Sequence, residues 1–220
     1  MTAIRRIVDL RHLLSSPVLD QGQRPTCLAL ATSQVHQASR GSSPLAPDAI
    51  VAAVVRSRGT IDGGMYTADV ATALLNTGQP ELSVWPLQTG LGEVSTPPPN
   101  CTNYPWYRAD LKNHSLHHVL DDALDDGELA VICIELTEDF YQTDGSDTPV
   151  DADSQLCNGY PRHAVVCVGR GVTPQGDDVY LVRNSWGSHW GAGGEAWLTY
   201  DYVRQHCYEV NRISRVLPEP

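Results

Sequence analysis

The spacing of apolar residues separates a helical first half of the chain from a second half rich in strands. In the first half, apolar side chains recur three and four positions apart, as on one face of an amphipathic helix. This spacing predicts three helices, over residues 27–35, 47–56 and 68–76. Residues 81–112 show neither a helical nor a strand period, which indicates a long connection between two halves.

The second half changes from a helical period to alternation. One more helix is predicted from His114 to Gly127, with an apolar stripe on one face and acidic residues outside it. Beyond Gly127, apolar and polar residues alternate between Gly- and Asp-rich turns, and strands are predicted at 129–136, 164–169, 178–184 and 194–200. Helices followed by strands favour an α+β fold with an antiparallel sheet or barrel, rather than an alternating α/β fold.

Two polar residues stand out in the strand-rich half, because each lies beside an apolar run. His163 opens one run and Asn184 ends another. If the two runs are neighbouring antiparallel strands, the two side chains meet, and a histidine held by an asparagine amide is half of a nucleophilic site. Cys27 is the candidate for the other half, because it falls in the first turn of a helix after Thr26 as the N-cap. Free N–H groups and the helix dipole there favour a thiolate, whereas the alternative is an inert, buried cysteine.

A catalytic cysteine also needs donors for the oxyanion that forms on the attacked carbonyl. Gln21 lies on the loop before Cys27, close enough to offer a side-chain N–H beside the Cys27 backbone N–H. The active site is then expected in a cleft between the helical and strand-rich halves. Gly63 and Gly64 form a dipeptide that either makes a turn or lets a ligand backbone approach, and taken alone it favours a turn.

The totals limit the function classes. A chain of 220 residues is long enough for one large domain or two lobes. The net charge of −11 argues against binding nucleic acid through phosphate contacts. No apolar run reaches the roughly 18 residues that span a bilayer, and residues 1–6 lack the apolar run of a signal peptide. We therefore expect no membrane partner, and a location in the cytoplasm or delivery into another cell.

Three histidines have a spacing that suits a metal site on a helix. His114, His117 and His118 are three and four positions apart, so two of them can share one face. No cysteine or carboxylate accompanies them at a characteristic zinc spacing. We therefore expect neither a metal nor another cofactor.

The six cysteines are too few for a disulfide scaffold in a chain of this length. Cys133 and Cys167 lie inside apolar runs, where a free cysteine behaves as a small buried hydrophobe. Cys101, Cys157 and Cys207 are either free or bridged, because spacing alone does not pair them.

The spacing of Cys27, His163 and Asn184 along the chain can be compared with that of a known family. His163 and Asn184 lie close to the roughly 130–150 residues after the cysteine that are typical of the papain and cathepsin family. Nearly the whole chain resembles a papain-like cysteine peptidase. The matching stretches are Val8-Asp-Leu-Arg, Asp20-Gln-Gly-Gln-Arg-Pro-Thr-Cys-Leu-Ala-Leu, Gly63-Gly64, Glu81-Leu-Ser-Val-Trp-Pro-Leu, Leu120 to Val131, His163-Ala-Val-Val, Asn184-Ser-Trp-Gly and Trp190-Gly.

The resemblance implies a fold and roles for single residues. The fold is a single two-lobed peptidase domain over residues 1–220, with a helical lobe at about 10–112, a β-rich lobe at about 113–220, and terminal segments that cross over. Cys27 is implied as the nucleophile, His163 as its base and later its acid, Asn184 as the group that orients the imidazole, and Gln21 as an oxyanion donor. The low pKa of a histidine-paired thiol in this family implies an ion pair.

The resemblance also implies a set of residues around the substrate. Trp186 shields the bond between histidine and asparagine from water, and Gly63 and Gly64 lie where an extended substrate backbone binds. The pocket for the second residue before the cut is bordered by Met65, Pro161 and Ala164.

The chain departs from the family pattern at several positions. Arg24 stands where a disulfide cysteine is expected, and Leu28 replaces a tryptophan beside the nucleophile. Cys157 and Cys207 resemble the positions of another family disulfide, which a reducing compartment leaves as thiols. No inhibitory pro-segment precedes Val8, so we expect a segment already removed, an enzyme made active, or one domain of a larger protein. The last two fit a bacterial-type enzyme or a delivered toxin domain that a separate inhibitor or immunity protein restrains.

The function expected is that of a thiol endopeptidase that cuts an extended polypeptide. One alternative keeps the chemistry but acts on an isopeptide or amide, as a deconjugating enzyme with a narrow cleft does. Another is a catalytically silent binding module on the same fold. The presence together of Gln21, Cys27, His163 and Asn184 argues against a silent module, because such a module needs none of their chemistry.

Overall fold

Three helices build the first lobe, in the places where apolar residues recur at helical spacing. They are α1 (Cys27–Arg40), α2 (Pro47–Arg58) and α3 (Thr67–Asn76). The computed structural model describes residues 3–90, 95–114, 118–159 and 161–218. Gly41 ends α1 in the left-handed conformation, with φ of 61°, and its N–H donates to carbonyl groups of the last turn. The three helices predicted in this half are confirmed.

An antiparallel sheet forms most of the second lobe and confirms the α+β class. Its strands in the described residues are β1 (Arg5–Asp9), β2 (Ala109–His114), β3 (Ala130–Glu135), β4 (Arg162–Val172), β5 (Asp178–Arg183), β6 (Glu195–Thr199) and β7 (Cys207–Val216). The strand order is β2-β7-β3-β4-β5-β6, and β1 pairs with β4 outside this path. Every one of these strand pairs is antiparallel.

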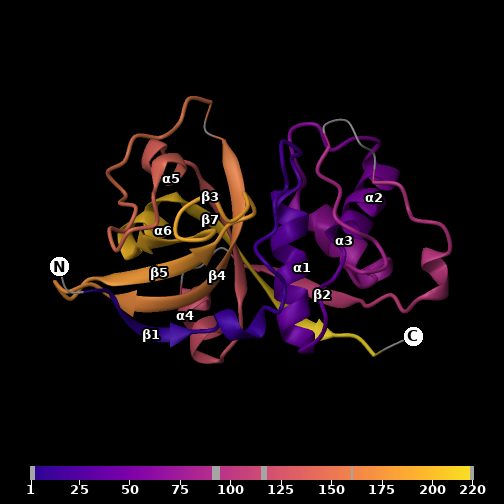
Figure 1. Ribbon diagram of the computed structural model, residues 1–220, viewed down its shortest axis with the longest axis horizontal. Helices are drawn as coiled ribbons and strands as arrows, with labels where there is room; N and C mark the ends of the chain where they lie inside the picture. Colours follow the sequence, from indigo (N-terminus) through magenta and orange to yellow (C-terminus); the bar gives the residue numbers. More distant parts are fainter. Residues whose placement is uncertain (1–2, 91–94, 115–117, 160, 219–220) are drawn as a thin grey trace.

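Short helices complete the strand-rich half. They are α4 (His118–Asp125), α5 (Glu138–Gln142) and α6 (Tyr200–His206), with 3-10 turns η1 (Arg11–Leu13) and η2 (Cys101–Asn103). In Figure 1, α5 and α6 lie with β3 to β5 in one lobe, while α1, α2 and α3 form the other. In the described part of the chain, no helix is both long enough and apolar enough to cross a membrane.

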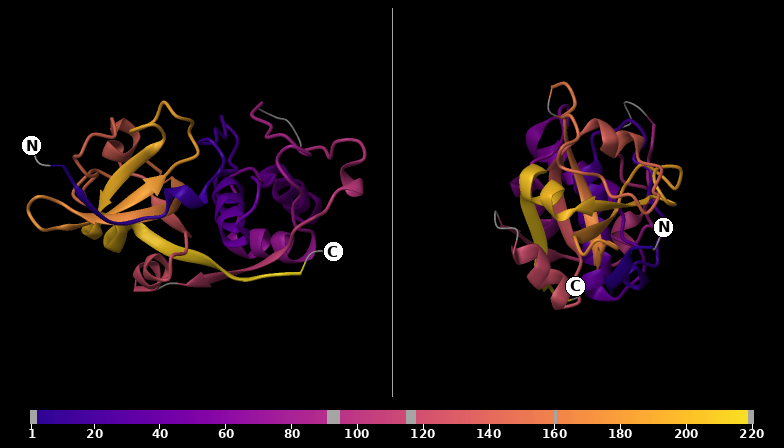
Figure 2. Two further views of the ribbon diagram at one scale, coloured as in Figure 1. Left: turned by 60° about the horizontal axis from the view of Figure 1, so that its bottom comes forward. Right: turned by 90° about the vertical axis from the view of Figure 1, so that its left-hand side faces the viewer.

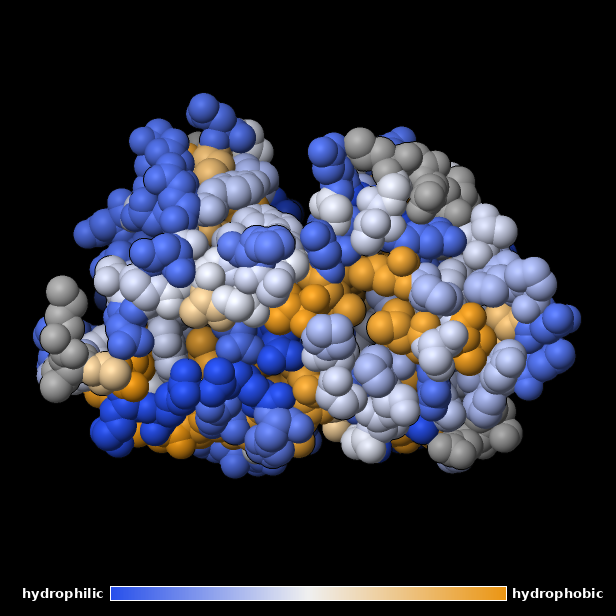
Figure 3. Space-filling view, in the orientation of Figure 1, coloured by the Kyte–Doolittle hydropathy of each residue, from blue (hydrophilic) through white to orange (hydrophobic). Residues whose placement is uncertain are grey.

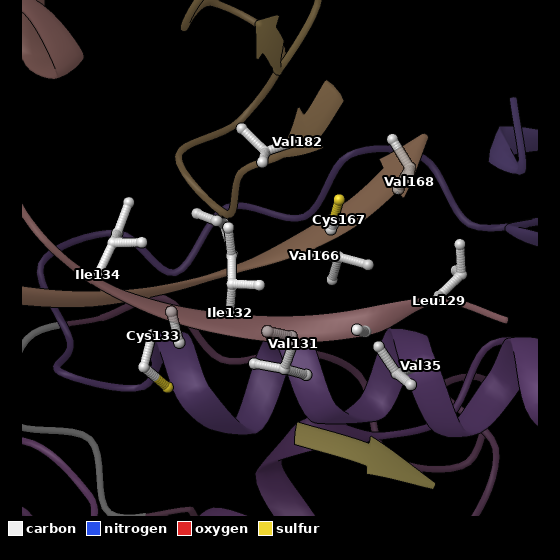
Figure 4. Packing of buried hydrophobic residues seen from close by; sticks show 14 of the residues in the cluster. Val35, Leu129, Val131, Ile132, Cys133, Ile134, Val166, Cys167, Val168 and Val182 are labelled. Atoms are coloured by element: carbon white, nitrogen blue, oxygen red, sulfur yellow. The ribbon is translucent and has the colours of Figure 1, made fainter. Parts of the chain in front are cut away.

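The core lies where α1 packs on the sheet. Figure 4 shows Val131 and Cys133 of β3 pointing toward α1, while Ile132 and Ile134 point to the opposite face. Both faces of β3 are buried, which explains its nearly continuous apolar sequence. Each such side chain contributes about 1.5–3 kcal/mol when it leaves water. Cys133 and Cys167 are 3% and 0% exposed, which confirms them as core residues.

The two ends of the chain lie against different lobes. β1 pairs with β4 in the strand-rich lobe, and the first described residues lie at the outer end of that lobe in Figures 1 and 2. β7 begins beside β3 and pairs over the rest of its length with β2, which packs on α3. The last described residues lie on the side of the helical lobe.

The prediction of one helix from His114 to Gly127 is wrong at its start. His114 is the last residue of β2 and pairs with Val210, and the described residues of α4 are His118–Asp125. His114 therefore does not share a helix face with His118, and His117 lies outside the described residues. The alternating residues of β2 are few and carry charges, so the stronger helical pattern after them concealed the strand.

The structure shows whether the cysteines are free or bridged, which the sequence left open. All six lie among the described residues, and each is a free thiol. The bridge between Cys157 and Cys207 that the resemblance implies is therefore absent.

Candidate active site

Cys27 is the first residue of α1 and lies half-buried at the boundary between the lobes. Thr26 precedes the helix as predicted, but its side chain makes no capping hydrogen bond, and its buried Oγ1 has no partner among the described residues. Burial raises the pKa of the Cys27 thiol, and the backbone N–H groups of Ala164, Leu28 and Cys27 partly offset the rise. This direction is opposite to the one that a helix start alone predicts.

His163 and Asn184 meet because β4 and β5 are antiparallel neighbours. His163 is the second residue of β4, and Asn184 directly follows β5. The His163 Nε2 atom lies 2.6 Å from the Asn184 Oδ1 atom, and both residues are buried. The side-by-side arrangement expected from the two runs is therefore present.

The Asn184 amide has a fixed orientation, and this orientation determines the histidine tautomer. The Ser185 backbone N–H donates to Asn184 Oδ1 at 2.7 Å, so this atom is an oxygen that accepts. His163 Nε2 must then carry the proton that it shares with Asn184 Oδ1. The Nδ1 atom of a neutral His163 is left as a proton acceptor.

Aromatic rings enclose the histidine. The Trp186 ring stacks on the imidazole of His163, with centroids 4.6 Å apart, and the Tyr141 ring stacks on Trp186 at 5.0 Å. The Phe140 ring makes T-shaped contacts with His163 and Trp186, with ring centroids 6.2 and 5.7 Å apart. His163 and Asn184 are 4% and 0% exposed beside these rings.

Burial also governs the charge of His163. Loss of solvent lowers the pKa of His163 to about 4, although its hydrogen bond with Asn184 acts in the opposite direction. For both Cys27 and His163, burial thus favours the uncharged form. The resting pair that burial favours is a thiol and a neutral imidazole, rather than the ion pair that the resemblance implies.

The loop before Cys27 is tied to the turn after β5. The Gln21 backbone N–H donates to the Ser185 carbonyl at 2.9 Å, and the Ser185 hydroxyl donates to Gln21 Oε1 at 2.7 Å. The Gln21 side-chain Nε2 donates to the Arg24 carbonyl at 2.8 Å. Both Gln21 and Ser185 are buried, so these bonds hold the two halves of the site together in a dry environment.

One pocket brings the candidate residues of both lobes together. It has a volume of about 280 Å³, and its wall contains Cys27, Leu28, Gly63, Gly64, Met65, Tyr66, Thr67, Cys133, Arg162, His163, Ala164, Tyr208 and Glu209. Figure 3 shows a notch between the two lobes at the upper edge of the molecule. A larger depression of about 650 Å³ near Arg11 contains neither Cys27 nor His163.

This geometry agrees with the comparisons to known proteins. Residues 108–214, which include β4, β5 and the turn after it, match the family model described as "Papain family cysteine protease". Over this part the chain is similar to the papain-like cysteine proteases. The matched part carries His163 and Asn184, while Cys27 lies outside it.

Solved structures share the fold of this papain-like chain over nearly its whole length. Xylellain, a cysteine protease from Xylella fastidiosa, is 22% identical with a TM-score of 0.71, covering 97% of this chain and 88% of that one. The bromelain protease from Ananas comosus, solved with the E64 inhibitor, is 16% identical with a TM-score of 0.73, covering 94% and 97%.

A curated relative matches over a short stretch. A "Cysteine protease" of Blomia tropicalis is 48% identical over 48 residues, which make up 22% of this chain and 13% of that protein. The match thus spans a small part of the relative.

Several residues of the papain-like pocket were not expected from the sequence. Thr67 of α3 donates to Glu209 Oε2 of β7 at 2.5 Å across the pocket, and Cys133 lies in the same wall. The sequence predicts Cys133 only as a core residue and predicts no element over β7, because that stretch mixes charged and apolar residues. Of the residues expected around the substrate, Pro161 and Trp186 do not line this pocket; the Pro161 carbonyl accepts from the Leu136 N–H instead.

The Gly63-Gly64 dipeptide forms a turn at the pocket wall. Both glycines have positive φ, of 78° and 97°, and the Gly64 N–H donates to the Ile61 carbonyl at 2.8 Å. The Gly64 carbonyl accepts from Arg58 Nη1 at 3.3 Å. A substrate backbone that binds Gly64 must therefore share its carbonyl oxygen with Arg58 or replace these internal bonds.

Proposed function

We propose that this chain is a thiol endopeptidase that cleaves extended polypeptides through Cys27, His163 and Asn184. The observation that carries this proposal is that Cys27 and His163 line one pocket, with His163 held by Asn184 at 2.6 Å. A nucleophile, a base and a group that orients the base are the parts that acyl transfer needs. The match of residues 108–214 to the papain family cysteine protease model supports the roles of His163 and Asn184.

The first step forms a bond between Cys27 and the substrate. The Cys27 sulfur attacks the carbonyl carbon of the scissile peptide, while the thiol proton passes to Nδ1 of His163. Because burial disfavours both the separate thiolate and the separate imidazolium, the two charges form together and stabilise each other. Asn184 Oδ1 accepts from Nε2 throughout and keeps the ring in place.

The oxyanion on the attacked carbonyl needs hydrogen-bond donors. The Cys27 backbone N–H lies in the first turn of α1, where it has no partner within the helix. Gln21 has a side-chain NH₂ group with two N–H bonds, of which one is used on the Arg24 carbonyl. We assign the second N–H to the oxyanion, and removal of such a donor typically lowers kcat about 10²–10³-fold.

The remaining steps return the enzyme to its starting state. His163 gives its proton to the leaving amine as the bond between carbon and nitrogen breaks, which leaves an acyl group on the Cys27 sulfur. Water then attacks the thioester and passes a proton to His163. The acid product leaves, and the proton returns to the Cys27 sulfur.

Selective labelling of Cys27 tests the proposal directly. We expect an epoxide or iodoacetamide to modify Cys27 faster than the buried Cys101, and to do so more slowly in a His163→Ala variant. Peptide mapping by mass spectrometry locates the label. Equal rates at Cys27 and Cys101 would remove Cys27 from the mechanism.

Cleavage by a variant without the nucleophile gives a second test. Cys27→Ala should lower kcat at least about 10⁴-fold without loss of the fold, because the remaining groups only bind and polarise the substrate. Peptidase assays and circular dichroism measure the two properties, and Cys101→Ala is the control. New N-termini in a digested proteome identify the substrate, and exclusive release of a conjugated C-terminal tail would indicate a deconjugating enzyme instead.

A further inference from the structure

A buried guanidinium lies beneath the loop that precedes Cys27. Arg24 is 4% exposed, and its Nη1 atom donates to Asp48 Oδ1 at 2.8 Å and to the Gln88 carbonyl at 2.5 Å. Its Nη2 atom donates to the Ser95 hydroxyl at 2.6 Å, and that hydroxyl donates in turn to Asp48. Asp48 has no exposed surface and also accepts from the Gln88 N–H at 2.9 Å. One side chain thus joins the loop to the first turn of α2 and to a third segment.

The backbone of the same residue supports the groups beside the nucleophile. The Arg24 carbonyl accepts from Gln21 Nε2 and from the Thr26 N–H, each at 2.8 Å. The Arg24 N–H donates to the Gln21 carbonyl at 3.3 Å. The position of the Gln21 amide and the start of α1 at Cys27 therefore both depend on where the Arg24 backbone lies.

We propose that the buried ion pair of Arg24 with Asp48 positions the oxyanion donors, so that Arg24 is a positioning residue for the reaction assigned to Cys27. This inference rests on the proposed function. A buried ion pair adds little to stability relative to apolar residues of similar size, because desolvation offsets the attraction between its charges. The planar, forked guanidinium of Arg24 does fix the orientation of this side chain, since each of its N–H groups must meet a separate acceptor.

The chemistry of this site shows why a fixed loop matters. Catalysis by an oxyanion hole requires donors that are already in place when charge develops, and small displacements weaken it steeply. The loop between Gln21 and Cys27 contains no regular element of its own in the described structure. Arg24 also stands where the resemblance leads one to expect a disulfide cysteine, so this ion pair occupies the place of a covalent constraint.

Two reactions of the same sulfur separate positioning from general structural support. Alkylation by iodoacetamide needs the Cys27 thiolate but forms no oxyanion. Acylation by a peptide or ester needs both the thiolate and the donors that stabilise the oxyanion. A variant that only displaces the oxyanion donors therefore loses acylation and keeps alkylation. Loss of the fold would abolish acylation and remove the preference of iodoacetamide for Cys27 over the other free cysteines.

The test uses the double variant Arg24→Met/Asp48→Leu, which removes both charges together and leaves neither unpaired. We expect kcat for a peptide substrate to fall at least about tenfold, with KM and the iodoacetamide rate at Cys27 changing less than about threefold. In a Gln21→Ala background the same double change should have a smaller effect on kcat than in the wild type, because one of the two donors that it displaces is already absent. Arg212→Met is the control, since Arg212 of β7 forms ion pairs with Asp126 and Glu128 and does not line the pocket.

The outcomes that overturn the inference are distinct. A loss of kcat below tenfold, an equal loss of kcat and alkylation, or effects that add to those of Gln21→Ala would each show that the ion pair does not position the oxyanion donors. If the double variant fails to fold, Ser95→Ala removes a single neutral contact of Arg24, and it must still lower kcat more than the alkylation rate. Wild-type protein that neither cleaves peptides nor reacts selectively at Cys27 refutes the proposed function instead.

Discussion

The His36 imidazole lies on α1 without any exposed surface, and the Gln79 amide nitrogen lies 3.2 Å from its Nδ1 atom. The other ring nitrogen, Nε2, has no partner among the described residues. Burial, with a smaller contribution from the charge of Arg40, lowers the pKa of His36 to about 3. His36 is therefore neutral in the folded protein over the whole physiological range.

This neutral histidine makes stability depend on pH. The folded pKa lies below the ordinary value of 6.5, so between those two values the unfolded chain binds a proton that the folded one does not. The stability that depends on a neutral His36 is fully present above about pH 6.5. As pH falls toward 3, the free energy of unfolding decreases by up to about 1.4 kcal/mol per pH unit. His36→Gln should make the free energy of unfolding less dependent on pH between about 6.5 and 4.

Urea titrations at several pH values measure this dependence. His12→Gln, at an exposed histidine, is the matched control substitution. His163 is buried in the same way, so the His36 variant retains part of the slope. An unchanged slope in His36→Gln would contradict the assignment of a neutral, buried imidazole.

Among the elements, β1 and β4 approach each other more closely than a side chain on Gly169 would allow. A Cβ atom on Gly169 would overlap the carbonyl oxygen of Val8. Gly169→Ala should therefore push β1 away from β4 and destabilise the protein by about 1–3 kcal/mol. The midpoint of urea unfolding measures the change.

Gly127→Ala is the comparison for Gly169. A Cβ atom at Gly127 meets no other atom within 4 Å, so only its positive φ of 75° opposes alanine there. That strain costs roughly 1 kcal/mol. A smaller loss at Gly169 than at Gly127 would contradict the close approach of the two strands.

Sequence patterns located those elements that bury one continuous apolar face. α1, α2 and α3 were predictable from helical spacing, and β3 to β6 from runs of apolar residues between turns. β1, β2 and β7 were not found, because their burial depends on partner strands far away in the sequence. The division of the chain into lobes at residues 112 and 113 stays a prediction.

The candidate site also contains contacts that the sequence predicted and contacts that it did not. The pairing of His163 with Asn184 followed from two runs that could be recognised as neighbouring strands. The contacts of Arg24 with Asp48, and of Thr67 with Glu209, join segments that no periodicity connects. The raised pKa of Cys27 likewise depends on burial by both lobes, which a local pattern around residue 27 does not contain.

The whole molecule carries a net charge of −11, which affects how substrates reach the cleft. A negative field attracts cations, and salt screens it over about 10 Å at 0.1 M. We expect kcat/KM for a peptide with flanking lysines to fall several-fold as ionic strength rises from about 0.01 to 0.15 M. The same peptide with serines in their place should change little, and equal salt responses would exclude steering by the overall charge.

β7 crosses between the lobes and follows every other strand of the described sheet in the order of synthesis. Residues 207–216 enter the sheet between β2 and β3, so two earlier strands stay apart until they arrive. Cys27, His163 and Asn184 are all translated before that strand. The three proposed catalytic residues therefore leave the ribosome before the strand that joins the two lobes.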